Sequence, residues 1–266
     1  MAPAIDGATR LNVIIGDPIA QVKSPAGMTA AFARDGRNAV MLPVRIASAN
    51  LELFLKASDR VSNLDGIVVT VPHKFACFKH CKTISERAEI LRAVNIMRRN
   101  KDGSWHGDMV DGLGFVKATE RKGFSFVGKR ALLIGAGGAG SAISLGLLEA
   151  GVASLSIHDT DSVRRDALIA KLEAISGNVH AGNSNPAGFD LIVNASPSGM
   201  PTYEPLPIDT ARLTSDMFVG CVVTDPALTP LIDAARTAGC LTVTGVEMYR
   251  ALEDIMVDFL SDGATA

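Results

Sequence analysis

A glycine-rich turn lies halfway along this chain of 266 residues, directly after a short apolar run. Residues 130–134 form that run, residues 135–140 follow the pattern Gly-x-Gly-x-x-Gly, and residues 141–150 predict an apolar helix that ends at Gly151. A strand, a turn and a helix in this order are typical of a dinucleotide-binding fold, with an ordinary tight turn as the alternative. Because the turn lies mid-chain, other structure must occupy the first half.

Each glycine of the turn has its own predicted role. Gly135 lets the chain turn sharply out of the strand, Gly137 lets the backbone approach a pyrophosphate, and Gly140 lets the helix pack closely on the sheet. The N–H groups at the start of that helix then bind the phosphates. We expect the cofactor to contact the whole turn: Gly135, Ala136, Gly137, Gly138, Ala139 and Gly140.

An acidic residue follows the next predicted strand. Asp159 comes directly after residues 154–158 and lies nineteen positions beyond Gly140. A carboxylate about 20 residues beyond the turn accepts hydrogen bonds from the adenosine ribose, and it repels the extra phosphate of NADP. The sequence therefore predicts NAD as the cofactor. Arg164 and Arg165 keep NADP possible, although two arginines in the first turns of a helix also suit a solvated surface.

Composition excludes several classes of partner. The 26 basic and 28 acidic side chains nearly balance, which gives no electrostatic case for nucleic acid or an anionic membrane. No apolar run is long enough to span a bilayer, and the first seven residues lack the layout of a signal peptide. We expect a cytoplasmic protein, and the sequence leaves open whether it is a monomer or a homodimer.

Strand-like and helix-like runs alternate along the first half. Residues 11–15, 39–44 and 64–71 predict strands, and residues 25–35 and 51–58 predict helices. This alternation is typical of parallel strands joined by crossover helices. The turn signal at residues 100–103 predicts an antiparallel hairpin at the edge of this first sheet.

A second alternating series begins at Arg130. Its predicted strands are residues 131–134, 154–158, 189–194, 218–223 and 241–243. The fold class is therefore α/β, with two α/β domains. Residues 246–259 carry apolar side chains at 249, 252, 256 and 259, which predicts an amphipathic helix able to cap either domain.

The chain has four cysteines, too few for a disulfide framework at this length. His73, Cys77, His80 and Cys81 are zinc-ligand residue types at spacings that could share a helix face. Structural zinc usually takes its ligand pairs from two separate loops. We therefore predict no metal site, with Cys77 and Cys81 packed as small hydrophobic residues.

Lys74 is the first candidate for chemistry. Residues 69–74 end a strand and start a helix, with Pro72 at a first-turn position that it tolerates well. The positive end of the helix dipole disfavours an ammonium group there, which suits a lysine that exchanges protons. A surface lysine that simply reaches water is the alternative.

Two further helix starts carry polar groups. Asp108 and Asp111 lie on a glycine-flanked loop before a helix, so Asp111 is a helix N-cap, a partner of Lys74, or both. Ser24 precedes a proline as an N-capping serine would, and a helix start with a nearby lysine suits a substrate carboxylate. These starts could converge on one small anionic molecule if the fold brings them together.

At these residues the chain resembles the shikimate dehydrogenase family, including its quinate and shikimate/quinate members. The matching segments run in order over nearly the whole chain, which is far more specific than the glycine turn alone. They are residues 16–25, 69–74, 85–88, 93–95, 107–112, the turn at 135–140, 194–200 and 245–248.

The resemblance implies a division of the chain. Residues 1–110, completed by 245–266, would form a substrate-binding domain, and residues 111–244 a Rossmann-type domain for the dinucleotide. The C-terminal helix would return to the first domain, with the active site in the cleft between the two. The expected partner is a small hydroxy acid.

The resemblance also implies roles for single residues. Lys74 and Asp111 match the two residues that touch the reacting hydroxyl, the lysine as acid/base and the aspartate as the group that orients it. Ser24, Thr70 and Asn95 match substrate contacts, and Glu86 a position linked to the cofactor. The reaction is reversible hydride transfer between a secondary alcohol and the nicotinamide, without a metal. Beyond the turn, the cofactor positions are Asp159, Ser196, Val222, Gly245 and Met248.

Several positions depart from the family pattern. Polar residues that contact or support the substrate are replaced by Val22, Val68, Met109, Val110, Thr224 and Leu252. Each lost hydrogen bond in a buried site costs about 0.5–3 kcal/mol. The departures predict a substrate that is less hydroxylated than shikimate, or a different cyclic hydroxy acid. The alternatives are a true shikimate or quinate dehydrogenase and a catalytically silent NAD-binding sensor.

Overall fold

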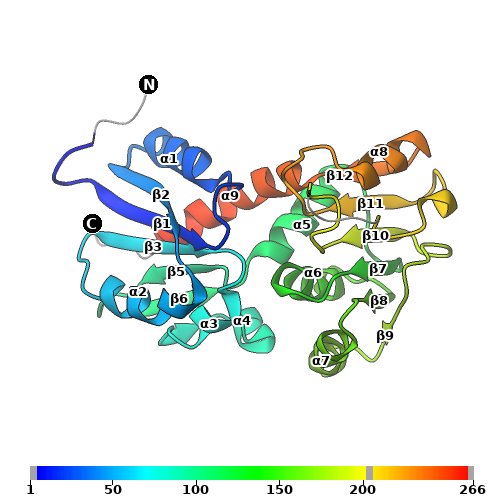
Figure 1. The fold of residues 1–266 in the computed structure, drawn as a ribbon, viewed down its shortest axis with the longest axis horizontal. Helices are drawn as coiled ribbons and strands as arrows, with labels where there is room; N and C mark the ends of the chain where they lie inside the picture. Colours follow the sequence, from blue (N-terminus) through cyan, green and yellow to red (C-terminus); the bar gives the residue numbers. More distant parts are fainter. Residues whose placement is uncertain (1–4, 202–205, 263–266) are drawn as a thin grey trace. The chain divides into compact units, whose positions relative to one another are not determined.

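The computed structural model describes residues 5–201 and 206–262, which divide into two compact units. The first unit consists of Met1–Val110 with Glu253–Ala266, and the second of Asp111–Leu252. Each unit holds its own six-stranded sheet flanked by helices (Figure 1). The expected α/β class with two α/β domains is confirmed.

The first unit contains a mixed sheet in the order β2-β1-β3-β5-β6-β4. Its parallel strands β1, β2 and β3 match the three predicted runs, although β3 ends two residues early. The hairpin β5–β6 is antiparallel as expected, but the short strand β4 pairs outside β6, so the hairpin is not at the edge. The bounds are β1 (Arg10–Gly16), β2 (Ala39–Arg45), β3 (Leu64–Val69), β4 (Thr83–Ile84), β5 (Ile96–Arg99) and β6 (Trp105–Asp108), with α1 (Ser24–Arg34), η1 (Ser48–Asn50), α2 (Leu51–Ser58), α3 (Lys74–Phe78) and α4 (Glu86–Leu91).

The second unit contains a fully parallel sheet in the order β12-β11-β10-β7-β8-β9. The strand order reverses between β7 and β10, the point at which open α/β sheets bind ligands. The short strand β9 was absent from the predicted strands, because only the first of its three residues is buried. The bounds are β7 (Arg130–Ile134), β8 (Ser154–His158), β9 (Val179–Ala181), β10 (Leu191–Asn194), β11 (Phe218–Cys221) and β12 (Leu241–Val243), with α5 (Asp111–Glu120), α6 (Gly138–Glu149), α7 (Ser162–Glu173), η2 (Thr210–Arg212) and α8 (Pro230–Thr237).

Continuous apolar runs explain why the central strands of this second sheet are buried. Leu191, Ile192 and Val193 in β10 are completely inaccessible to solvent, as expected when helices cover both faces of a parallel sheet. A cluster of buried side chains from β7, β10, β11 and α8 fills one face. The carboxyl ends of these strands are therefore held rigidly.

The last helix, α9 (Gly245–Ser261), is divided between the units after Leu252. In its second half, Leu260 packs so closely on β3 that a Cβ atom at Gly66 would lie 2.4 Å from the leucine Cδ2. The Phe259 ring stacks on His106 of β6 with centroids 5.7 Å apart. The expected return of the C-terminal helix to the first domain is confirmed.

Candidate functional site

The glycine turn joins β7 to α6 and has the steric features expected of it. Gly135 has a φ of +100°, which L side chains rarely adopt, and a Cβ atom there would lie 2.8 Å from the Ser196 nitrogen. A Cβ atom at Gly140 would lie only 1.8 Å from the Gly135 oxygen, so the helix packs directly on the turn. Nothing lies within 4 Å of the corresponding position at Gly137. This open backbone beside a helix start fits a dinucleotide pyrophosphate.

Asp159 lies immediately after β8, and its carboxylate is held by four hydrogen bonds. The Ala136 N–H donates to Oδ2 at 2.7 Å, and the Asp161 N–H donates to Oδ1 at 2.8 Å. The Arg164 guanidinium donates to both oxygens, at 3.2 Å from Nε and 2.8 Å from its terminal nitrogen. Burial raises the pKa of Asp159, but these hydrogen bonds outweigh burial and lower it below its usual value. The carboxylate is therefore ionised at neutral pH.

The remaining candidate cofactor residues follow the neighbouring strands β10, β11 and β12. The Ser196 hydroxyl donates to the Asn194 side-chain oxygen at 2.6 Å, and the Val222 N–H donates to the Asn194 carbonyl at 3.0 Å. A Cβ atom at Gly245 would lie 2.5 Å from the Val222 oxygen. Met248 follows in the first turn of α9 and is buried. The structure thus brings these residues, the turn and Asp159 to the carboxyl ends of one parallel sheet, where such sheets bind ligands.

The start of α9 is fixed by a capping box that the sequence analysis missed. The Glu247 carboxylate accepts hydrogen bonds from the Thr244 N–H at 2.9 Å and its hydroxyl at 3.0 Å, and the Glu247 N–H donates back to that hydroxyl. Lys122 forms an ion pair with the same carboxylate at 2.6 Å. The spacing of a threonine and a glutamate three residues apart was the available signal.

In the first unit, the candidate substrate residues lie near the carboxyl ends of β1 and β3. The Thr70 N–H donates to the carbonyl of Ile15 at 2.9 Å, and the Val94 N–H donates to the carbonyl of Lys74 at 3.0 Å. Lys74 and Asn95 are 8% and 2% exposed. The surface-lysine alternative is therefore wrong, because the Lys74 side chain is buried rather than extended into solvent.

Two local details of this region differ from the sequence expectations. Ser24 is the first residue of α1, and Lys23 occupies the N-cap without a side-chain hydrogen bond, so Ser24 is not an N-cap. Pro72 precedes the cap residue His73, and α3 begins only at Lys74 and spans five residues. Pro72 is therefore outside the helix rather than in its first turn.

The two carboxylates of residues 107–112 have different surroundings. Asp108 in β6 accepts hydrogen bonds from Arg87 at 2.5 Å and from the Met109 N–H at 2.7 Å, and also from the Ser85 hydroxyl. Both carboxylate oxygens of Asp108 therefore accept hydrogen bonds, and those from Ser85 and Arg87 connect the start of α4 to β6. Asp111 is the first residue of α5 and is buried. Asp111 therefore remains the candidate for chemistry of the two.

Asn95 links the substrate residues to this segment. Its side-chain oxygen accepts a hydrogen bond at 2.8 Å from the N–H of Val110, the residue before Asp111. Its own N–H donates to the Asp108 carbonyl at 2.9 Å, and its carbonyl accepts from the Val69 N–H at 2.7 Å. Asn95 therefore holds the end of β3 and the chain leading to Asp111 together.

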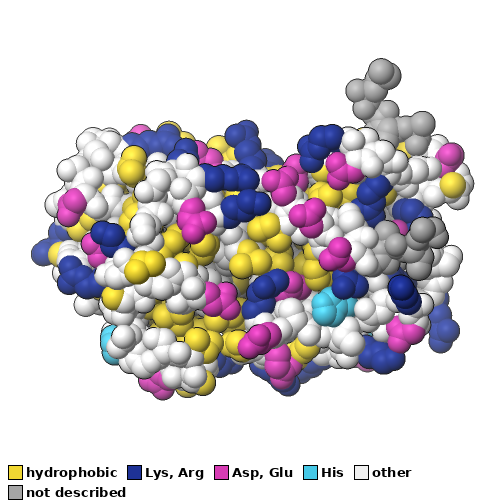
Figure 2. Space-filling model, turned by 180° about the vertical axis from the view of Figure 1, so that it is seen from behind, with side chains coloured by type: hydrophobic (Ala, Val, Ile, Leu, Met, Phe, Trp, Pro, Cys, Tyr) yellow, Lys and Arg dark blue, Asp and Glu magenta, His cyan; other side chains and the backbone are white. Residues whose placement is uncertain are grey.

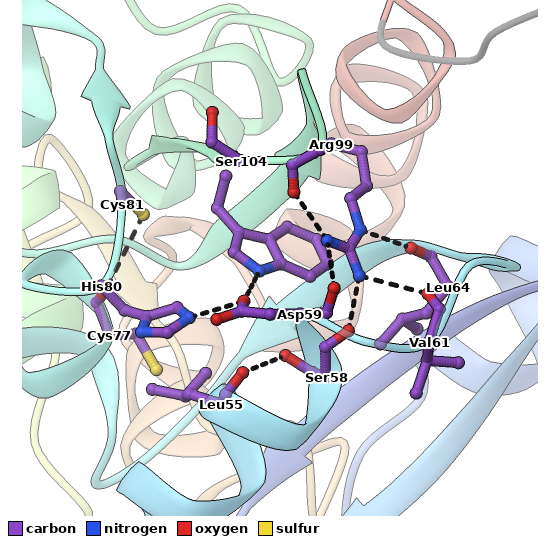
Figure 3. A network of polar contacts seen from close by, with 12 residues as sticks. Leu55, Ser58, Asp59, Val61, Leu64, Cys77, His80, Cys81, Arg99 and Ser104 are labelled. Atoms are coloured by element: carbon purple, nitrogen blue, oxygen red, sulfur yellow. Dashed lines mark hydrogen bonds and ion pairs between the residues drawn. The ribbon is translucent and has the colours of Figure 1, made fainter. Parts of the chain in front are cut away.

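The histidines and cysteines near α3 have structural contacts. The His73 ring lies 2.7 Å from the Ile46 carbonyl. The His80 ring lies 2.9 Å from the Asp59 carboxylate, which also accepts a hydrogen bond from Trp105 (Figure 3). Burial raises the pKa of Cys77 and of Cys81 to about 12, so both thiols stay protonated. Within residues 5–201 and 206–262, no three His, Cys, Asp or Glu side chains form a group that could hold a metal ion.

The surface carries charges of both signs. On the face in Figure 2, lysine and arginine side chains are interspersed with aspartate and glutamate, so this face has no extended basic patch. No described helix combines the length and the hydropathy of a membrane-spanning segment.

Comparisons with known proteins agree with this geometry. Residues 14–97 match the model of the shikimate dehydrogenase substrate binding domain. A protein of Rubrobacter xylanophilus named shikimate dehydrogenase (NADP⁺) is 35% identical over 94% of this chain and 91% of its own length.

Solved structures give the same result. A shikimate dehydrogenase in complex with NADP⁺ has a TM-score of 0.90 and 25% identity, over 98% of this chain and 93% of its own. The quinate dehydrogenase of Corynebacterium glutamicum in complex with NAD has a TM-score of 0.85 and 28% identity, over 96% of this chain and 94% of its own. From the extent of these matches along the sequence, this chain belongs to the shikimate dehydrogenase family.

Proposed function

We propose that this protein is an NAD(P)-dependent oxidoreductase that transfers a hydride between a ring secondary alcohol and the nicotinamide, with NAD preferred over NADP. The alcohol is that of a hydroxy acid of the shikimate/quinate type. The first unit binds this acid and the second binds the cofactor. The observation that carries the cofactor choice is the ionised Asp159 carboxylate beside the glycine turn.

The second unit provides the groups that hold the dinucleotide. The N–H groups of residues 137–140 at the start of α6 bind the pyrophosphate, and the backbone at Gly137 leaves room for it. Asp159 accepts the ribose hydroxyls. Ser196, Val222, Gly245 and Met248 surround the other end of the cofactor, which supplies the hydride acceptor when bound. No step in this assignment needs a metal.

The first unit provides most of the groups assigned to the substrate, and Asp111 is the first residue of the second unit. Lys74 takes the proton of the reacting hydroxyl during oxidation and returns it during reduction. Asp111 orients that hydroxyl. Ser24, Thr70 and Asn95 hold the substrate, and burial of Ser24 and Asn95 keeps their polar groups away from competing water.

The substrate is less hydroxylated than shikimate. Val68 is 5% exposed, Met109 is 1% exposed and Leu252 is 7% exposed, so each replaces a family polar residue by a buried apolar side chain. Such side chains offer no hydrogen bond to a ring hydroxyl, and an unpaired buried hydroxyl costs about 1–3 kcal/mol.

A substrate screen tests this proposal. NADH and NADPH formation are followed by absorbance with shikimate, quinate and cyclic carboxylic acids that carry a single hydroxyl. We expect the single-hydroxyl acids to give the highest kcat/KM, with NAD better than NADP. Highest turnover of shikimate or quinate would instead show a true shikimate or quinate dehydrogenase. Tight NAD binding without turnover of any acid would show a silent sensor, which the retained Lys74, Asn95 and Asp111 disfavour.

Asp159 gives the test of cofactor choice. Asp159→Ala removes the carboxylate that accepts the ribose hydroxyls and repels a 2′-phosphate, so we expect NAD affinity to fall and NADP affinity to rise. Calorimetric titration with both nucleotides measures this change. Unchanged affinities for both would contradict the assignment of Asp159. The cytoplasmic location and the choice between monomer and homodimer stay predictions.

A further inference from the structure

The Asp159 carboxylate has no acceptor capacity left. An ionised carboxylate offers about four lone-pair positions. The N–H groups of Ala136 and Asp161 take one position on each oxygen, and the Arg164 guanidinium takes another on each. A ribose hydroxyl can therefore donate to Asp159 only after one of these donors has left.

The four donors differ in how easily they leave. Ala136 lies in the turn between β7 and α6, and Asp161 is the N-cap of α7, so the fold fixes both N–H groups. Arg164 is held only through its long side chain, which is 50% exposed, whereas the Asp159 side chain is 6% exposed. The guanidinium is the one donor among these four that can move into solvent without unfolding a turn.

We propose that Arg164 is a specificity-determining residue that competes with the ribose of NAD for Asp159. This inference rests on the proposed function, because it assumes that Asp159 receives the adenosine ribose. Binding of NAD displaces the guanidinium from both carboxylate oxygens. The displaced guanidinium lies in the first turn of α7, where it can form bidentate hydrogen bonds with the 2′-phosphate of NADP.

The charges of Asp159 and Arg164 support an effect of Arg164 on the binding of both NAD and NADP. Asp159 alone repels a 2′-phosphate, but the Asp159–Arg164 pair carries no net charge. Arg164 therefore reduces the preference for NAD over NADP that Asp159 creates. It lowers the affinity for NAD by occupying the carboxylate, and it raises the affinity for NADP by offsetting the negative charge. The neighbouring Arg165 is paired with Asp166 at 2.7 Å instead, which makes it a matched control on the same helix.

The experiment is calorimetric titration of the purified protein and its variants with NAD and with NADP, without any hydroxy acid. The Arg164 guanidinium is half-exposed, so solvent weakens its pair with Asp159, and in Arg164→Ala we expect the Kd for NAD to fall by only about two- to fivefold. We expect the Kd for NADP to rise by roughly tenfold or more, because a charge-assisted contact to the phosphate is lost. Arg165→Ala is expected to leave both constants unchanged.

A double-mutant cycle separates competition from any general effect on the helix. In an Asp159→Asn background the target of the competition is weakened, so Arg164→Ala should no longer tighten NAD but should still weaken NADP. A higher Kd for NAD in Arg164→Ala, or no change for either nucleotide, overturns the proposal for Arg164. The proposed function survives that result if the unaltered protein binds NAD and oxidises a hydroxy acid. Absence of binding of both nucleotides to the unaltered protein overturns both.

Discussion

The two units assemble their candidate residues in different ways. In the second unit, six consecutive residues form the turn through their backbone. A Cβ atom at Gly140 would lie only 1.8 Å from the Gly135 oxygen, so the turn has no room for a side chain there. In the first unit, Ser24, Thr70, Lys74 and Asn95 come from segments up to 71 residues apart and act through their side chains. Adding a side chain to the glycine turn is thus expected to disturb the second unit. In the first unit, removing a functional group from one of these side chains is the damaging change.

Loss of the Lys74 ammonium should have the greatest effect, and it should reduce turnover without changing cofactor binding. Lys74→Ala removes the group that exchanges the hydroxyl proton, so kcat should fall by about 10²–10⁴. NAD affinity should not change, because Lys74 belongs to the other unit. Steady-state kinetics and calorimetry measure the two quantities. Lys79→Ala, at an exposed position just after the same helix, is the control; full turnover in Lys74→Ala would contradict the acid/base role.

Two alanine substitutions in the turn separate backbone packing from cofactor binding. Gly140→Ala places a methyl group against the Gly135 carbonyl, and such overpacking destabilises a protein by about 1–3 kcal/mol. Gly137→Ala meets no protein atom within 4 Å and has ordinary φ, so its stability should be unchanged while its NAD affinity falls. Urea unfolding and calorimetric titration distinguish the two. Equal stability of both variants would show that the turn does not pack as described.

The smallest expected effect concerns the capping box of α9. Burial raises the pKa of Glu247, but hydrogen bonds from Lys122 and Thr244 outweigh burial and lower it. An acid whose pKa is lowered on folding stabilises the protein above its unfolded-state pKa, and that contribution is lost as pH falls through the folded-state pKa. Glu247→Gln should therefore cost about 1 kcal/mol at pH 7, as other cap losses do.

Urea unfolding of both proteins from pH 7 to pH 3 measures this difference. It should shrink below about pH 4.3, the ordinary pKa of glutamate, as the carboxyl group of the unaltered protein becomes protonated. A difference that stays constant over this range would contradict the contribution of the ionised carboxylate. Glu52→Gln, in an exposed pair with Lys56, serves as the control with a smaller effect.

The sequence predicted the second unit better than the first for a physical reason. Gly135 and Gly140 are required by local sterics, so a short pattern reveals the turn, and apolar runs reveal its buried strands. The two-residue strand β4 depends on pairing with β6, and β9 of the second unit has a single buried residue, so local patterns did not reveal either strand. The catalytic roles of Lys74 and Asp111 came from family resemblance, and they remain proposals.

The partnership of Asp159 with Arg164 shows a second limit. The sequence places a carboxylate after β8 and two arginines in the next helix, but it does not show which arginine forms the ion pair with Asp159. Only the structure shows that Arg164 reaches Asp159 while Arg165 turns to Asp166. Side-chain pairing of this kind depends on the orientation of α7, which residue order alone does not give.

The division of α9 has a consequence for the order in which the protein matures. The second unit is continuous in sequence, from Asp111 to Leu252, but the first unit needs residues after 252. During synthesis, residues 1–110 are therefore translated first but cannot complete their unit until the residues after 252 have been translated. Until Leu260 emerges from the ribosome, the face of β3 at Gly66 lacks its cover. We expect the second unit to complete its folding before the first, although its chain begins 110 residues later.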